Sequence, residues 1–157
     1  MDYQIRKAKA EDISEIINLC AEHAEYEKIP FEKNGKAVKL AAALFAPNPP
    51  CHCLIAENET GIFGYATYTF DYSTWDADYY AHMDCLFLKP KARNYGIGEA
   101  LLKTIIQEAK NRNCNIMQWH TPPFNERAIK FYHRIGATSR EKTRFYLNEE
   151  TMGLLVK

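Results

Sequence analysis

Hydrophobic positions along the chain follow two spacings, so the sequence predicts both helices and strands. After residue 12, apolar side chains such as Ile13, Ile16 and Ile17 recur at intervals of three and four, which is typical of a helix with one buried face. A second helix is expected over residues 36–45, and the prolines that follow should end it, because proline has no amide hydrogen for a helical bond. A first strand is expected over residues 3–7.

The middle of the chain is rich in strand-forming residues, and its second half returns to helical spacing. Three runs separated by turns should form an antiparallel meander, over residues 52–57, 61–70 and 79–88. An amphipathic helix should begin near Gly98. The remaining elements are expected to be a strand over residues 116–120, a helix capped by Asn125 that ends at Gly136, and a last strand over residues 143–147.

The stretch Arg93-Asn94-Tyr95-Gly96-Ile97-Gly98 joins an apolar, strand-like run to the amphipathic helix. Its two glycines let the backbone turn sharply, and the amides at a helix start attract anions such as a diphosphate. A P-loop would need Lys and Ser or Thr after the last glycine, where this chain has Glu99 and Ala100. A dinucleotide fingerprint would need a third glycine where this chain has Leu101. The pattern that remains is Arg-x-x-Gly-x-Gly.

This pattern, over residues 93–98, resembles the coenzyme A loop of the GCN5-related N-acetyltransferase (GNAT) family. A second block over residues 125–137, which begins Asn-Glu-Arg-Ala, resembles the second motif of that family at the expected distance downstream. Residues 26–27, 52–57 and 64–66 are similar to residues of the spermidine/spermine (diamine) acetyltransferase branch. The resemblance extends over nearly the whole chain and is closest to the diamine branch.

The resemblance implies a single N-acetyltransferase domain over residues 1–157, with acetyl-CoA as the acetyl donor. The predicted element order β-α-α-β-β-β-α-β-α-β matches the α/β (α+β) acyltransferase fold of the family, a mixed central sheet with helices on both faces. A length of 157 residues fits one domain. The resemblance also suggests a homodimer.

For the acetyl donor, the resemblance implies three groups of contacts. Backbone groups of the strand before the loop would hold the pantetheine arm, the loop amides would hold the diphosphate, and residues of the next helix would lie beside the cofactor. The cofactor residues implied in this way are Leu86, Phe87, Leu88, Arg93, Asn94, Tyr95, Gly96, Ile97, Gly98, Glu99, Asn125, Ala128 and Tyr132.

Two side chains are predicted to move protons. The family match implies that Tyr132 is the acid, because a phenol with an ordinary pKa of about 10 is protonated at neutral pH and can protonate the leaving thiolate. Asp84 stands where the diamine branch has a glutamate that acts through water, so Asp84 is expected to assist deprotonation of the amine. His82 is an alternative base, since an imidazole can accept a proton near neutral pH and should share the face of Asp84.

The predicted acceptor is a small-molecule amine with positive charge, such as a diamine or polyamine. The residues expected to bind it are Tyr26, Glu27, Trp75 and Asp84. Cys85 and Ser73 stand where the diamine branch has aspartates, so two of the carboxylates expected for a polyamine are missing.

Other functions stay open at this point. An acetyltransferase for an amino-acid derivative, an amine-bearing drug or a peptide N-terminus could use Lys142 and Arg144 to recognise a carboxylate. A coenzyme A binding module without catalysis is a further alternative. Cys85 could in principle carry the acetyl group with help from His82 or His120, but a buried strand cysteine is usually inert, so direct attack by the amine is expected.

Composition narrows the range of partners. The chain has 20 basic and 20 acidic residues and a formal net charge of zero, so binding to nucleic acid is not expected. No apolar run is long enough to cross a membrane and no secretory signal is evident, so a cytoplasmic location is expected. The stretch Cys51-His52-Cys53 has no second pair of ligands, so no metal is expected.

Overall fold

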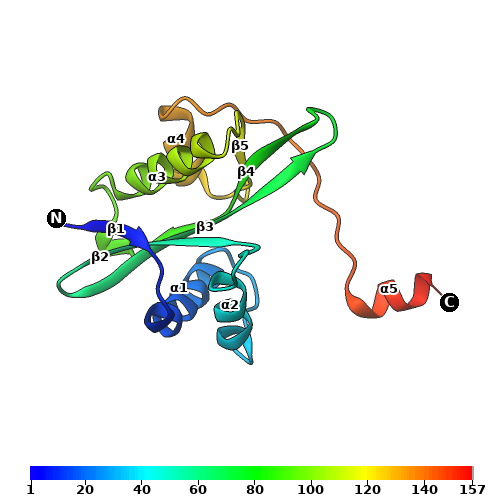
Figure 1. The fold of residues 1–157 in the computed structure, drawn as a ribbon, viewed down its shortest axis with the longest axis horizontal. Coiled ribbons are helices and arrows are strands. Elements are labelled where there is room, and N and C mark those ends of the chain that lie inside the picture. Colours follow the sequence, from blue (N-terminus) through cyan, green and yellow to red (C-terminus); the bar gives the residue numbers. More distant parts are fainter. Residues whose placement is uncertain (157) are drawn as a thin grey trace. The chain divides into compact units, whose positions relative to one another are not determined.

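The computed structural model describes residues 1–156 of the chain (Figure 1). The chain divides into two compact units, Met1–Pro122 and Pro123–Lys157, and each is described by itself. Among the described helices, none has the length and hydropathy that crossing a membrane requires.

The first unit is built on a five-stranded sheet with the strand order β1-β2-β3-β4-β5. Its strands are β1 (Gln4–Lys7), β2 (His52–Asn58), β3 (Gly61–Ser73), β4 (Asp78–Leu88) and β5 (Met117–Trp119). The first four strands pair antiparallel, whereas β5 runs parallel to β4. The predicted mixed sheet is therefore confirmed.

Three helices cover this sheet. They are α1 (Ile13–Tyr26), α2 (Lys36–Leu44) and α3 (Ile97–Asn111), and two short 3-10 turns, Ala10–Asp12 and Pro90–Ala92, precede α1 and α3. In Figure 1, α1 and α2 lie on one face of the sheet and α3 lies on the other. This arrangement confirms the expected helices on both faces.

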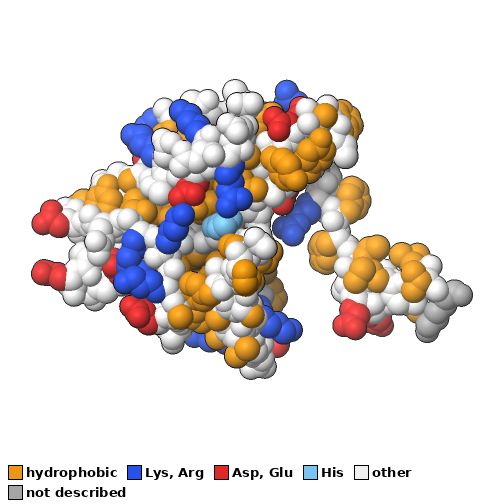
Figure 2. Space-filling view, in the orientation of Figure 1, with side chains coloured by type: hydrophobic (Ala, Val, Ile, Leu, Met, Phe, Trp, Pro, Cys, Tyr) orange, Lys and Arg blue, Asp and Glu red, His pale blue; other side chains and the backbone are white. Residues whose placement is uncertain are grey.

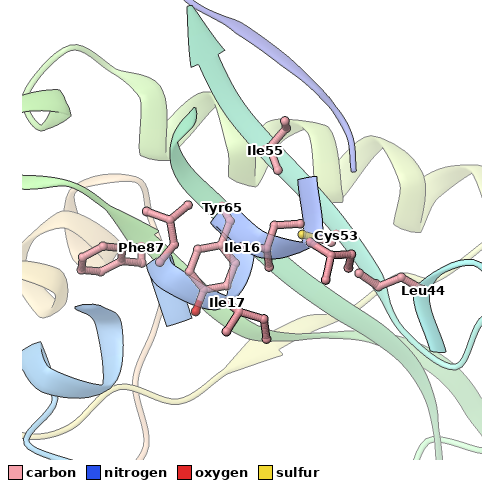
Figure 3. Packing of buried hydrophobic residues seen from close by; sticks show 9 residues of the cluster. Ile16, Ile17, Leu44, Cys53, Ile55, Tyr65 and Phe87 are labelled. Carbon is pink, nitrogen blue, oxygen red and sulfur yellow. The ribbon is translucent and has the colours of Figure 1, made fainter. Parts of the chain in front are cut away.

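The core between α1 and the sheet is formed by side chains that share one face of neighbouring strands. Ile55, Tyr65 and Phe87 come from β2, β3 and β4, and they pack with Ile16 and Ile17 of α1 (Figure 3). Strand residues two apart point to the same face, which explains why Cys53 joins Ile55 in this cluster. Tyr65 is only 1% exposed, although its ring carries a hydroxyl that needs a hydrogen-bond partner.

A cluster of charged side chains links β1 to β2 and to the turn before α1. The Arg6 guanidinium lies 2.7 Å from Asp12 and 2.7 Å from Glu57, so it links β1, the turn before α1, and β2. Asp12 also accepts a hydrogen bond from the Lys9 amide. Hydrogen bonds from Arg6 lower the pKa of both carboxyl groups.

The second unit contains α4 (Glu126–Arg134) and α5 (Glu149–Leu155). The predicted cap of α4 is confirmed, because the Asn125 side chain accepts a hydrogen bond of 3.2 Å from the Ala128 amide. The chain leaves α4 through Gly136, whose φ of 92° is in the left-handed region that glycine tolerates.

The last predicted strand, over residues 143–147, is wrong. These residues have no regular secondary structure, and Phe145 and Tyr146 are 89% and 84% exposed. Three consecutive apolar residues, 145–147, do not alternate with polar ones, and strand preference is realised only by pairing with a neighbour. The next regular element is α5, which is capped by Asn148: its side chain accepts a hydrogen bond from the Thr151 amide. Figure 2 shows exposed hydrophobic side chains over α5.

Candidate active site

The glycine loop has the backbone geometry that an anion requires. Gly96 has a φ of 78° and stands directly before α3, and the Ala100 amide makes a 3.0 Å helical bond to the Gly96 carbonyl. The amides of Ile97 and Gly98 precede this first bond, so helical geometry cannot supply carbonyls for them. A Cβ at Gly96 would meet nothing within 4 Å, so the space beside the turn is open. The loop can therefore receive an anionic group against the start of α3.

Arg93 connects this loop to the strand and helix beside it. Its Nε donates a 2.9 Å hydrogen bond to the carbonyl of Leu88 at the end of β4. Its guanidinium lies 4.9 Å from the centre of the Tyr26 ring and 5.7 Å from that of Phe87. The loop is thus fixed to β4 and to the end of α1, while contact of Arg93 with a phosphate stays a prediction.

The edge of β4 that faces β5 is open beyond Met83. The parallel pairing with β5 ends where Met83 meets Trp119, and among the described strands none pairs with residues 84–88 on this side. On the other side, Leu86 and Leu88 keep their antiparallel partners in β3. An extended ligand could complete the sheet along this edge, as an added strand does.

A β-bulge places Asp84 at the point where the open edge begins. Thr67 of β3 pairs with Cys85 whereas the next residue, Tyr68, pairs with Met83, so Asp84 is the extra residue in β4. A bulge bends the strand locally and redirects a side chain. Asp84 is accordingly exposed, although it lies in the middle of the sheet's longest hairpin.

The charge of Asp84 acts on groups of the face that α1 covers. It raises the pKa of the thiols of Cys20, Cys51 and Cys85, after the larger effect of burial, and it opposes the lowering of the His23 pKa. The four groups come from α1, β4 and the turn before β2. The negative charge of Asp84 therefore influences the titratable groups on this face of the sheet.

Cys85 is not equipped as a nucleophile. Burial, followed by the charge of Asp84, raises the pKa of its thiol to about 12. The thiols of Cys85 and Cys20 lie within hydrogen-bonding reach of the Tyr65 hydroxyl. Since the thiolate is the reactive form of cysteine, Cys85 is a poor acetyl carrier at neutral pH.

His23 connects α1 to this face of the sheet. Its Nε2 lies 3.2 Å from Oε1 of Glu27, and its Nδ1 lies 3.1 Å from the hydroxyl of Tyr65. Its ring stacks on Phe87 at 5.2 Å between centroids and an angle of 23°. Burial lowers the His23 pKa, and the nearby Glu27 carboxylate opposes this shift.

The structure gathers some of the predicted acceptor residues and not others. Tyr26 and Glu27 lie at the end of α1 with His23, and Phe87 lies beneath them. Trp75 is 97% exposed in the turn between β3 and β4, and Asp84 is six residues into β4, about 20 Å along the strand. Within the first unit, Trp75 is therefore not part of the cluster around His23.

The alternative base, His82, has a different environment. Its ring lies 5.5 Å from that of His120, at a tilt of 55°, where the chain leaves β5. It pairs with Gln118 across the parallel ladder. The part of the chain that is described contains no group of three His, Cys, Asp or Glu side chains placed to bind a metal ion.

Tyr132 is described only within the second unit. It lies on α4 next to Phe131, with 5.2 Å between the ring centroids, and its carbonyl accepts a 3.0 Å bond from the Ala137 amide. Its role as acid, and the cofactor contacts of Asn125 and Ala128, stay predictions.

Two features of the site were missed by reasoning from the sequence. The spacing of His23 and Glu27, four residues apart on a helix, was a usable signal that they meet. The bulge at Asp84 had no such signal, since no glycine or proline marks it.

Known proteins are similar to this chain over most of its length. Residues 10–137 match the model of the family described as "Acetyltransferase (GNAT) family". Thialysine N-epsilon-acetyltransferase from Bos taurus is 32% identical over 141 residues, which cover 85% of this chain and 82% of that protein. Spermidine/spermine N(1)-acetyltransferase-like protein 1 from Homo sapiens is 32% identical over 145 residues, which cover 87% of this chain but 21% of that protein.

A solved structure shares the fold. Aminoglycoside N-acetyltransferase AAC(6')-Iy, determined in complex with CoA, is similar with a TM-score of 0.80 and 18% identity. The similarity covers 94% of this chain and 95% of that one. At this identity it is evidence about the architecture alone.

Proposed function

Since this chain belongs to the GNAT family of acetyltransferases, we propose that it transfers the acetyl group of acetyl-CoA to a primary amine of a small cationic substrate such as a diamine or polyamine. The choice of substrate is supported by two carboxylates whose charges act on the His23 imidazole: Glu27 at the end of α1, whose Oε1 lies 3.2 Å from Nε2, and Asp84 of β4. Opposite charge favours binding of an ammonium group near them.

The residues present fit the acetyl donor. The open turn at Gly96 and the amides that begin α3 suit a diphosphate, and the edge of β4 beyond Met83 suits an extended arm. Acetyl-CoA would supply an activated thioester. The chain's part is to orient the donor along β4 and to bring the amine beside Asp84.

Asp84 handles the proton of the amine in this proposal. An alkylammonium with a pKa near that of lysine, about 10.4, is neutral in fewer than about 1 molecule in 1,000 at pH 7. A carboxylate beside it, acting directly or through water, binds the cation and receives the proton. When the neutral amine forms the C–N bond and the C–S bond breaks, Tyr132 would give its phenol proton to the sulfur, and the proton that the new amide nitrogen loses would restore the phenol.

The amine attacks directly, without an acetylated cysteine on the protein. Support comes from the raised pKa of Cys85, about 12, which keeps the thiol protonated at neutral pH.

A second candidate acceptor is an amino acid with an amine in its side chain. The relative from Bos taurus is named for thialysine, and such a substrate has a carboxylate that a diamine lacks. Lys142 and Arg144 are the candidates to recognise that carboxylate.

An amine panel tests the proposal. Release of free thiol from acetyl-CoA is measured with diamines, lysine analogues and uncharged-tail monoamines. Asp84→Asn should reduce kcat/KM for the preferred cationic amine by about 100-fold, whereas Glu59→Gln, in the turn between β2 and β3, should leave it unchanged. A preference for lysine analogues would favour the second candidate. Absence of thiol release with every amine, despite binding of coenzyme A, would show a module without catalysis.

The same proposal includes the assembly. Residues 1–157 would form one N-acetyltransferase domain, present in the cytoplasm as a homodimer. Light scattering on the purified chain would report twice the 18.2 kDa mass of one copy.

A further inference from the structure

The two nitrogens of His23 are engaged in a way that fixes the uncharged ring in one form. A neutral imidazole has one N–H and one lone pair, and a carboxylate can only accept. Nε2 therefore carries the hydrogen and donates to Glu27 at 3.2 Å. Nδ1 then accepts from the Tyr65 hydroxyl at 3.1 Å, and Tyr65 itself is 1% exposed and immobilised in the core.

Every element around this ring contributes to its charge state. Glu27, directly after α1, and Asp84 from β4 favour the protonated form, while Arg93 from the loop before α3 opposes it. Tyr65 from β3 contributes a neutral hydroxyl. Burial outweighs the two carboxylates, so the pKa of His23 lies below its ordinary value of 6.5 and the ring is uncharged at neutral pH.

We propose that His23 is a positioning residue that sets the preference of the acceptor site for cationic amines. Uncharged, it holds the Glu27 carboxylate in place by one N–H and leaves its negative charge available to the ammonium group of the acceptor. Protonated, it forms an ion pair with Glu27 and adds a positive charge that repels the acceptor. This inference rests on the proposed function.

Protonation of His23 should change the preference of the site between amines in one direction. As pH falls through the lowered pKa of His23, protonation of the ring weakens binding of a diamine but not of a monoamine with an uncharged tail. Both amines carry the same reacting group, whose own protonation cancels in the ratio of their kcat/KM values. The ratio isolates the second charge.

The experiment compares a diamine with the monoamine of equal chain length, using the full chain and acetyl-CoA. In the unmodified protein the ratio of kcat/KM values should fall as pH is lowered from about 7.5 through the pKa of His23, which burial places below its ordinary value. His23→Gln cannot be protonated, so its ratio should not vary with pH. His23→Leu should raise KM for the diamine about fivefold at pH 7.5 with kcat changed less than about twofold.

The chain offers a matched control in His52. This half-buried imidazole stacks on Tyr68 and meets the Phe70 ring edge-on, and burial lowers its pKa too. His52→Leu should keep the pH dependence of the unmodified protein. If His23→Gln also keeps it, the inference is wrong.

A binding measurement separates this inference from the proposed function. In an NMR titration, with the His23 signal assigned by its loss in His23→Gln, the diamine should shift the imidazole midpoint to lower pH and the monoamine should not. An active enzyme without this shift would overturn the inference alone. A protein that releases no thiol with either amine would overturn the proposed function and this inference with it.

Discussion

Gly64 of β3 lies directly opposite Leu88 of β4, and the two strands meet there without room for another carbon. A Cβ at position 64 would overlap the Leu88 side chain and lie 3.0 Å from the carbonyl oxygen of Phe87. The backbone torsions of Gly64 are ordinary, so space and not torsion explains the glycine. Leu88 is also the residue whose carbonyl holds Arg93.

Gly64→Ala should therefore destabilise the protein and weaken its hold on acetyl-CoA together. We expect the free energy of unfolding to fall by about 1–3 kcal/mol, because the added methyl overpacks the strand pair, and KM for acetyl-CoA to rise. Denaturant unfolding and kinetics measure the two effects. Gly153→Ala in α5, where nothing lies within 4 Å of the added carbon, is the matched control. Equal stability of the two variants would contradict the steric reading.

Arg6→Met should cost about 2–3 kcal/mol of stability at neutral pH, because it leaves Asp12 buried without its cation. The cost is kept below that of a fully buried pair by the 23% exposure of the Arg6 side chain. Lys7→Met removes the pair with Glu108, in which Lys7 is 69% exposed, and should cost less than about 1 kcal/mol. Urea unfolding of both variants provides the comparison.

The cost of Arg6→Met should shrink in acid. Arg6 lowers the pKa of Asp12 and Glu57 in the folded protein, so its contribution is complete above their unfolded values, near pH 4, and is lost as pH falls through the lowered ones. The unfolding energies of variant and unmodified protein should converge between about pH 4 and pH 2. A constant difference over that range would exclude the cluster of charged side chains as its source.

Tyr132→Phe should lower kcat by about 100-fold or more while binding of coenzyme A is retained, because only the proton donor is lost. Tyr146→Phe is the control, since Tyr146 belongs to the same unit and is 84% exposed. Turnover and calorimetric binding together provide the measurement. Unchanged turnover in Tyr132→Phe would assign the acid to another group.

Cys85→Ala should retain kcat within about threefold, because the high pKa of this thiol makes it unfit to carry the acetyl group. Mass spectrometry of the unmodified protein mixed with acetyl-CoA alone should show no acetylated cysteine. An acetyl adduct on Cys85 that disappears on addition of amine would reverse this conclusion.

The sequence was sufficient for the sheet and for the helices that cover it. Periodicity located α1, and proline marked the end of α2 within one residue of Leu44. The meander of β2, β3 and β4 followed from alternation and turns. The predicted strand over residues 143–147 was wrong because strand preference alone does not form a strand without a neighbouring strand to pair with. The Asn148 cap and the acidic first turn after it favour a helix next along the chain.

The candidate site was less accessible to sequence reasoning than the fold. Motifs located the glycine loop at Gly96, because a turn of this kind depends on backbone geometry that few residues permit. The role of His23 depends on Tyr65, which is 42 residues away along the chain. Contacts of that kind arise from packing and leave no local pattern to detect.

Because β5 ends early, part of β4 can bind a ligand through its backbone, whatever its side chains are. In the described part of the sheet, β4 continues for five residues past Met83, its last residue paired with β5. Hydrogen bonds to the backbone along these five residues are all that is needed to extend the sheet there. Hydrogen bonds of that kind do not depend on which side chains stand at positions 86 and 88. An extended ligand bound along this edge would be recognised through the backbone of residues 84–88.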